Sequence, residues 1–228
     1  NPKNFVVECD EIFEDFVNAT KKCNVVAVLI EPIRATHGDL HFKKQFLQDV
    51  CTFCTSNDIK IIFDEVQTGM GVTGTNWYYE QLGVQPDIVV FGKKAQLSGI
   101  MVTDKSSEIF TQKEKKLEAT WDATLEDMIR CKYILKAYNE LDILSNVQSR
   151  SAQLIKGIKN PRVKNLRCAG LLVGFDLGSS KERNEFQQQC FDKGLLINTA
   201  GKNTIRLRPN LAVSYNEVEE ALSIINSL

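Results

Sequence analysis

The chain has 228 residues, of which 43% are hydrophobic and 25% are charged, and its formal net charge is -1. This composition argues against a disordered chain, and the near-neutral charge gives no electrostatic sign of a nucleic-acid or anionic-membrane partner. The apolar runs are too short to span a bilayer, so no membrane partner is expected. Seven irregularly spaced cysteines are typical of reduced thiols, which predicts a cytoplasmic protein without a metal site.

The first half of the chain predicts alternating strands and helices. A short amphipathic helix over residues 12–22 precedes an apolar, β-branched run over 25–30, which we expect to be a strand buried on both faces. A helix over 42–56 follows, with Cys51 and Cys54 on its face, and then buried strands over 60–63 and 88–91. Strands joined by helices indicate a parallel sheet with crossover connections.

The second half predicts a long helix and then an α+β region. The helical rhythm of residues 124–144 continues to 156 without a break in the pattern. The remaining elements are expected to be strands around Gly170 and Gly174, at 195–198 and at 204–207, and helices over 182–193 and 215–228. Ser214 is the predicted N-cap of the last helix, because its hydroxyl oxygen can accept from backbone amides of the first turn.

Polar side chains stand at the ends of three predicted strands. Glu31 follows the first strand, Asp64 follows the second, and Lys94 comes after the third. Ligands of open parallel sheets bind outside the carboxyl ends of the strands. The three side chains therefore predict an active site at this edge of the sheet.

The residue types at this edge suit chemistry on an aldehyde cofactor. A lysine amine in its neutral form, such as that of Lys94, can form a Schiff base with pyridoxal 5'-phosphate (PLP). Asp64 is the candidate to hold the proton on the pyridine nitrogen, while Glu65 should point away from the ring. Val66 would pack against the ring face, and Gln67 would hydrogen-bond the phenolic oxygen.

Four segments together resemble the class III PLP-dependent aminotransferases. They are IFDEVQTGMGVTG at 62–74, PDIVVFGKK at 86–94, LIEPI at 29–33 with Gly38 and Asp39, and IRLRPNL at 205–211. The resemblance implies an α/β fold of the PLP-dependent transferase type I. Residues 1–144 would be part of the large PLP-binding domain with its mixed, mostly parallel sheet. Residues 145–228 would form the α+β small domain.

The doubled lysine is most similar to the lysine 6-aminotransferase branch of this family. Gly99 lies five residues after Lys94, which is the spacing of the family's single lysine, so Lys94 is preferred over Lys93. Alternation along an extended strand would also send Lys93 to the opposite side. The Thr120–Trp121 pair matches the same branch. A 4-aminobutyrate or ornithine aminotransferase is the alternative that the resemblance leaves open.

The resemblance implies further roles. Arg206 would bind the α-carboxylate of the amino-acid substrate or of 2-oxoglutarate, and Glu31 would pair with Arg206 when no carboxylate is present. Thr120 would donate its hydroxyl to the cofactor phosphate of a neighbouring subunit, which implies a homodimer with shared active sites. Lysine would lose its terminal amino group to 2-oxoglutarate.

Two departures from the family pattern affect these expectations. The turn after Glu31 reads Arg34-Ala35-Thr36 where the family has a Gln-Gly-Glu sequence, and Asp122 replaces a glycine. Family members also carry upstream residues that supply the phosphate-binding loop, so we expect this chain to be one part of a longer enzyme. The alternative is a non-catalytic remnant that acts as a dimer-forming module.

Overall fold

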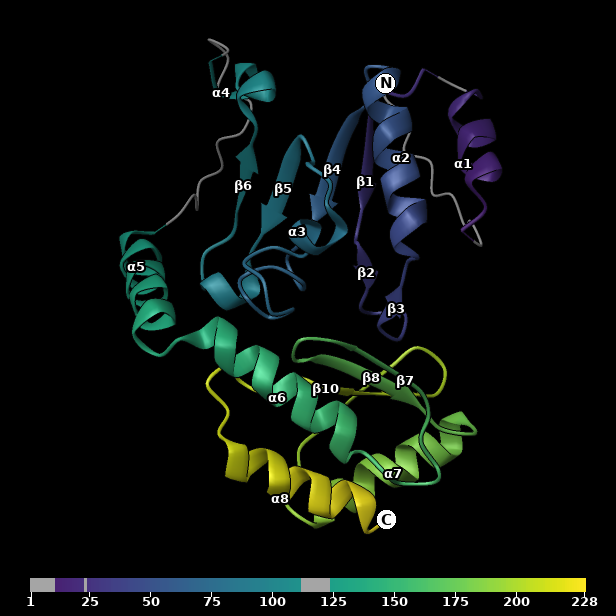
Figure 1. The fold of residues 1–228 in the computed structure, drawn as a ribbon, viewed down its shortest axis with the longest axis vertical. Helices are drawn as coiled ribbons and strands as arrows, with labels where there is room; N and C mark the ends of the chain where they lie inside the picture. Colours follow the sequence, from purple (N-terminus) through teal and green to yellow (C-terminus); the bar gives the residue numbers. More distant parts are fainter. Residues whose placement is uncertain (1–10, 23, 112–123) are drawn as a thin grey trace.

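The computed structural model describes residues 11–22, 24–111 and 124–228. In this part of the chain, two four-stranded sheets lie one above the other, with a short hairpin between them (Figure 1). The first sheet consists of β1 (Ala27–Ile30), β4 (Lys60–Asp64), β5 (Ile88–Phe91) and β6 (Gly99–Val102). The second sheet consists of β7 (Lys164–Ala169), β8 (Leu172–Asp176), β9 (Asn198–Ala200) and β10 (Thr204–Leu207). The predicted α/β fold with an α+β C-terminal region is confirmed.

The first sheet has the order β1-β4-β5-β6. β1, β4 and β5 are parallel, as predicted, and β6 is antiparallel to β5. The connections carry α2 (Lys44–Ser56) and α3 (Tyr78–Leu82), while α1 (Phe13–Thr20) precedes β1. β6 is absent from the sequence prediction because a four-residue run beginning at a glycine gives no distinct strand pattern.

Helix α2 forms because its apolar residues recur on one face. Phe46, Leu47 and Val50 are buried in a cluster with Phe63 of β4. The predicted helix-face cysteines, Cys51 and Cys54, lie on the same buried face. Burial raises the pKa of these thiols to about 11 and about 12, so both are inert, apolar packing groups at neutral pH.

The burial of strand β1 differs from the prediction for residues 25–30. The apolar run is expected to be buried on both faces, but Leu29 is 64% exposed. Val28 and Ile30 pack instead against the cluster around α2. Side chains alternate along a strand, and within the described residues only the α2 side of β1 is covered.

The second sheet is antiparallel, with the order β7-β8-β10-β9. One face is covered by α6 (Ile143–Gly157), α7 (Ser180–Asp192) and α8 (Tyr215–Asn226) (Figure 1). Ser214 caps α8 as predicted, since its hydroxyl accepts from the Glu217 amide at 3.3 Å. The core of this sheet also contains Ile33 and Val72, which come from the first half of the chain. The two sheets therefore share buried apolar contacts.

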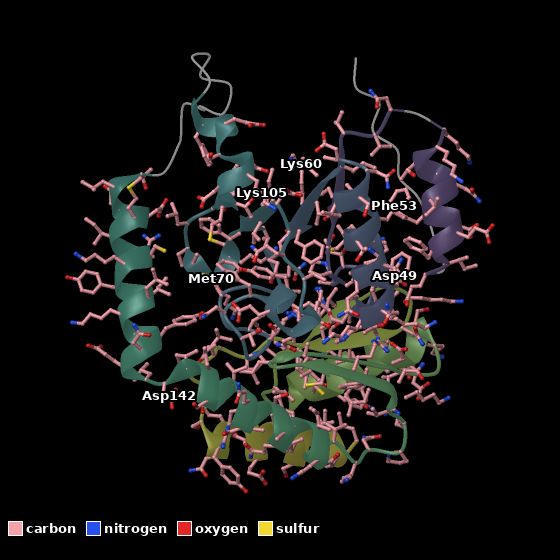
Figure 2. All side chains as sticks on the ribbon, turned by 45° about the horizontal axis from the view of Figure 1, so that its top comes forward. Asp49, Phe53, Lys60, Met70, Lys105 and Asp142 are labelled. Atoms are coloured by element: carbon pink, nitrogen blue, oxygen red, sulfur yellow. The ribbon has the colours of Figure 1, made fainter. Side chains whose placement is uncertain are left out.

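The long predicted helix is broken in two. α5 (Leu125–Glu140) ends before Asp142, which has a left-handed conformation with φ of 45°, and α6 begins at Ile143 (Figure 2). Tertiary contacts determine the new direction. Tyr138 donates a 2.5 Å hydrogen bond to the carbonyl of Met70, and Asn146 donates one of 2.8 Å to the carbonyl of Leu211. The apolar rhythm continues across the break and so conceals it in the sequence.

The remaining elements are short. The hairpin between the sheets consists of β2 (Ile33–Arg34) and β3 (Leu40–His41). After β5 come the 3₁₀ turn η1 (Lys93–Ala95), then η2 (Asp104–Ser106) and α4 (Glu108–Thr111). Of the helices described, none has the length and apolar character needed to cross a membrane.

Candidate active site

The strand ends named from the sequence lie at one edge of the first sheet. Ile30 pairs with Phe63, and Asp64 pairs with Val90, so neighbouring strands end at nearly the same level. Glu31 follows β1 directly, Asp64 is the last residue of β4, and Lys94 follows β5 after two residues. The parallel register thus brings the backbone positions of Glu31, Asp64 and Lys94 to the same edge.

Asp64 and Glu65 have different surroundings, as the alternation of a strand requires. Asp64 is half-buried, and its Oδ1 accepts a 3.0 Å hydrogen bond from the Val66 amide. Glu65 is buried and accepts from the amides of Tyr78 and Tyr79, at 2.7 and 2.9 Å. Burial raises the pKa of Glu65, and these hydrogen bonds from the start of α3 partly oppose that rise. Glu65 is a structural link to α3 and is directed away from Asp64.

Val66, two residues after Asp64, lies beside Gly92, two residues before Lys94. A Cβ built at Gly92 would lie 3.6 Å from Cγ1 of Val66 and 3.0 Å from Oγ of Ser98. A side chain at position 92 would therefore crowd the space between the two segments. Val66 and Gln67 are half-buried, as residues lining a ligand site would be.

The two lysines differ in exposure. Lys94 is half-buried, whereas Lys93 is exposed and has a positive φ of 44°. Burial lowers the pKa of Lys94, and the nearby charge of Arg208 lowers it further. Both lysines lie in the η1 turn, so the expected alternation along an extended strand is wrong. The preference for Lys94 is supported by its burial instead.

Arg206 of β10 reaches the turn between β2 and β3. Its Nη1 donates a 3.2 Å hydrogen bond to the carbonyl of Ala35, and its buried Nε has no partner among the described residues. The expected ion pair with Glu31 is not formed. Among the described residues, no carboxylate lies within ion-pair distance of Arg206. Glu31 is half-buried beside the sheet edge, whereas Arg206 faces the hairpin.

Four charged residues around β10, in two ion pairs, were given no role from the sequence. Asp39 is completely buried and pairs with Arg208, and Arg167 pairs with Asp176 at 2.7 Å. Thr204, Arg206 and Arg208 alternate along one strand, and this spacing was a signal that all three share a face. No sequence signal points to Arg167. Thr120, the expected phosphate donor, lies outside the described residues.

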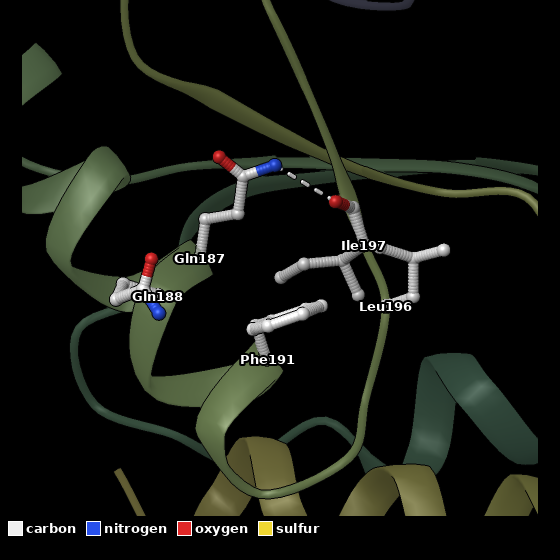
Figure 3. A pocket seen from close by; sticks show the side chains of 5 residues that line it. All are labelled: Gln187, Gln188, Phe191, Leu196 and Ile197. Carbon is white, nitrogen blue, oxygen red and sulfur yellow. Dashed lines mark hydrogen bonds between the residues drawn. The ribbon is translucent and has the colours of Figure 1, made fainter.

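A surface cleft lies apart from this site. Figure 3 shows it between α7 and the segment leading into β9. Gln187 donates a 2.9 Å hydrogen bond to the carbonyl of Ile197 there. The cleft contains no charged side chain and none of the predicted site residues, so it is not the candidate active site. Its lining residues are Gln187, Gln188, Phe191, Leu196 and Ile197.

Comparison with known proteins gives consistent matches. The family model of the class III aminotransferases matches residues 3–228. The L-lysine-epsilon aminotransferase of Mycobacterium tuberculosis is 33% identical over 223 residues, covering 91% of this chain and 48% of that protein. The 4-aminobutyrate aminotransferase of Schizosaccharomyces pombe is 34% identical over 216 residues, covering 90% of this chain and 45% of that protein.

A solved structure agrees with these matches. The structure of lysine aminotransferase from M. tuberculosis superposes with a TM-score of 0.89 at 32% identity, covering 94% of this chain and 52% of that one. This chain spans about half the length of the relatives that it matches. The family match extends over nearly all of its residues, from 3 to 228. The chain belongs to the class III aminotransferase family.

Proposed function

We propose that the protein containing this chain is a PLP-dependent aminotransferase that moves the terminal amino group of L-lysine, or of a related ω-amine, to 2-oxoglutarate. The observation that carries the proposal is the common edge of the adjacent parallel strands β4 and β5, where Asp64 ends β4 and Lys94 follows β5. Similarity to L-lysine-epsilon aminotransferases supports the choice of donor.

The residues at this edge fit the cofactor. A carboxylate, a partly desolvated amine and an aliphatic side chain stand at one sheet edge. The absence of a side chain at Gly92 leaves open a space beside Val66 that a Cβ would narrow. Asp64 would hold the ring nitrogen, Val66 would pack on the ring face, and Gln67 would donate to the phenolic oxygen. Thr120 would bind the phosphate. When bound, PLP supplies an aldehyde for bonding to amines and a ring that takes up electrons.

Lys94 would hold and move the proton. Its pKa is lowered by burial and by Arg208, so a larger share of its amine is unprotonated near neutral pH than for an exposed lysine. In this form the amine of Lys94 would hold the cofactor through its aldehyde, and when free it would accept a proton from a substrate carbon. Lys93, which is exposed, lacks this environment.

Arg206 would bind the substrate carboxylate. Its guanidinium has no carboxylate partner among the described residues, and its Nε is buried without an acceptor. A buried donor without a partner favours binding of an anion that can satisfy it. The carboxylate of an amino acid, or of 2-oxoglutarate, is such an anion. We retain Glu31 as a substrate-binding residue at the sheet edge, without the ion pair to Arg206.

The wider organisation is also proposed. Residues 1–144 and 145–228 would be parts of a large and a small domain, and the protein would work in the cytoplasm as a homodimer with shared active sites. The surface of α5 supports dimer formation, because Met128, Ile129, Tyr133 and Leu135 are all exposed apolar residues. The described cysteines are all free, as expected for reduced thiols.

Substrate profiling of the full-length protein tests the proposal. With PLP and 2-oxoglutarate, turnover should be fastest with L-lysine and slower with ornithine and 4-aminobutyrate. Fastest turnover of 4-aminobutyrate would favour that alternative, which the similarity to the S. pombe enzyme supports. A folded protein that binds no PLP and turns over none of the three amines would be the non-catalytic module.

A further inference from the structure

The buried carboxylate of Asp39 lies above Gly174 of the second sheet. Asp39 ends the turn between β2 and β3, and a Cβ built at Gly174 would lie only 3.0 Å from its Oδ2. Gly174 pairs with Arg206 on one side and with Arg167 on the other. Residues directly opposite one another on antiparallel strands have neighbouring side chains. The Asp39 carboxylate therefore lies between two arginines of the flanking strands.

Asp39 nevertheless pairs with a third arginine. Nη2 of Arg208 donates to Oδ1 of Asp39, and Arg208 follows Arg206 by two positions, on the same face of the strand. Nη1 of Arg208 is fixed by the carbonyls of Leu207 and Val173, at 2.9 and 3.3 Å. Oδ2 of Asp39 has no partner within the described residues. The direct ion pair with Arg208 is thus the largest compensation of the buried charge, and the charges of Arg206 and Arg167 add to it.

The charges on this face leave one guanidinium without a carboxylate. Arg167 pairs with Asp176 at 2.7 Å and also donates to the carbonyl of Gly38. The Asp39 carboxylate forms an ion pair with Arg208. Within the described ranges, Arg206 differs from the other two arginines in having only a backbone acceptor, the carbonyl of Ala35.

We infer that Arg208 is a positioning residue that keeps Arg206 available to the substrate by binding the Asp39 carboxylate. The inference rests on the proposed role of Arg206. A buried carboxylate without a cation is strongly unfavourable. Without Arg208, Arg206 would be the nearest guanidinium not engaged by another carboxylate, and it would turn to Asp39. The substrate carboxylate would then compete with an internal one.

Opposite effects of two neutralising variants test this inference. In the full-length, PLP-loaded protein, the dissociation constant of glutarate, a non-reacting dicarboxylate, is measured by calorimetry for Arg208→Gln, Asp39→Asn and the double variant. Arg208→Gln should weaken binding by at least about tenfold, because Asp39 captures Arg206. Asp39→Asn should bind glutarate no more weakly than wild type, and the double variant should return to within about threefold of wild type.

A purely structural pair would behave differently. If the pair served only to fix the turn, Asp39→Asn and the double variant would both bind glutarate as weakly as Arg208→Gln, and this result would overturn the inference. If Arg208→Gln does not fold, as judged by circular dichroism, the Asp39→Asn value decides by itself. Arg206→Gln is the reference: unchanged glutarate binding there would refute the proposed role of Arg206, whereas lost binding without rescue in the double variant refutes only the inference about Arg208.

Discussion

The backbone amide of Leu171 donates a 2.8 Å hydrogen bond to the carbonyl oxygen of Val72, which joins the second sheet to the glycine-rich loop after β4. Both side chains are buried in the same core, together with Ile33. Asp64 ends β4 of the first sheet and Lys94 follows β5 of the same sheet, whereas Arg206 lies on β10 of the second sheet. The Leu171–Val72 contact therefore helps to fix the two sheets, and the candidate site residues on them, relative to one another.

Gly170→Ala should strongly destabilise the protein. A Cβ at this position would lie 2.3 Å from the Val72 carbonyl oxygen, and the φ of +59° is strained for alanine. We expect a loss of about 3 kcal/mol or more in the free energy of unfolding, measured with urea, because the backbone of the loop has to move. Gly194→Ala is the matched control, since φ is +87° there but the surrounding space is open. That control should lose only about 1 kcal/mol, and equal losses would contradict the steric explanation.

Lys94→Ala and Lys93→Ala should separate the roles of the two lysines. We expect the full-length Lys94→Ala protein to lose the PLP absorbance band that borohydride removes from the wild type, along with nearly all turnover. Lys93→Ala should keep the band and most of the turnover, because its side chain is exposed. The assignment of Lys94 is wrong if the band persists in Lys94→Ala and disappears in Lys93→Ala.

Asp64→Asn should reduce turnover without unfolding the protein. The amide oxygen of asparagine can still accept from the Val66 amide, now bonded to Oδ1 at 3.0 Å, so the turn should survive. The neutral amide cannot stabilise a protonated pyridine nitrogen, and we expect kcat to fall by at least about a hundredfold. Asp58→Asn, at an exposed position, is the control and should retain the wild-type rate. Similar kcat values for Asp64→Asn and the control would exclude the proposed contact.

His41 should make the protein less stable at acidic pH. Burial, followed by the charges of Arg167 and Arg208, lowers its pKa from 6.5 to about 4. As the pH falls, His41 is protonated in the unfolded chain before it is protonated in the folded protein. The contribution of neutral His41 to the free energy of unfolding is therefore fully present above about pH 6.5 and is lost as the pH falls towards 4. The loss is at most about 3 kcal/mol.

His41→Gln gives the corresponding measurement. Free energies of unfolding are determined between pH 7 and pH 4 for the wild type and the variant, because glutamine does not titrate in this range. The stability advantage of the wild type should shrink as the pH falls. Parallel curves for the two proteins would show that His41 remains as protonatable in the folded state as in the unfolded one.

Local patterns predicted most of the elements correctly. The strand over 204–207 was predicted with its observed bounds, and its alternation of buried Ile205 and Leu207 with Arg206 fits a sheet covered on one side. The site residues Asp64 and Lys94 were named because parallel strands bring their carboxyl ends to one edge, and the observed register does so. These features depend on neighbours in sequence or on a general rule of sheet geometry.

Other features depend on contacts between distant segments. The helix break at Asp142 is fixed by contacts of Tyr138 and Asn146 with other elements, so the unbroken apolar rhythm gave no sign of it. Likewise, the exposed face of β1 depends on which elements cover it, and the same apolar run suits an edge or a central position.

The charged residues around Arg206 also include features that the sequence predicts and features that depend on contacts between distant segments. The sequence by itself determined that Arg206 stands on a strand, that Glu31, Asp64 and Lys94 follow strands, and that the family motifs occur in order. Only the tertiary structure decided that Asp39, and not Glu31, is the carboxylate beside Arg206, and that Arg208 binds it. The physical reason is that ion pairing depends on distances in space, and those are set when the hairpin turn packs over Gly174 of the second sheet.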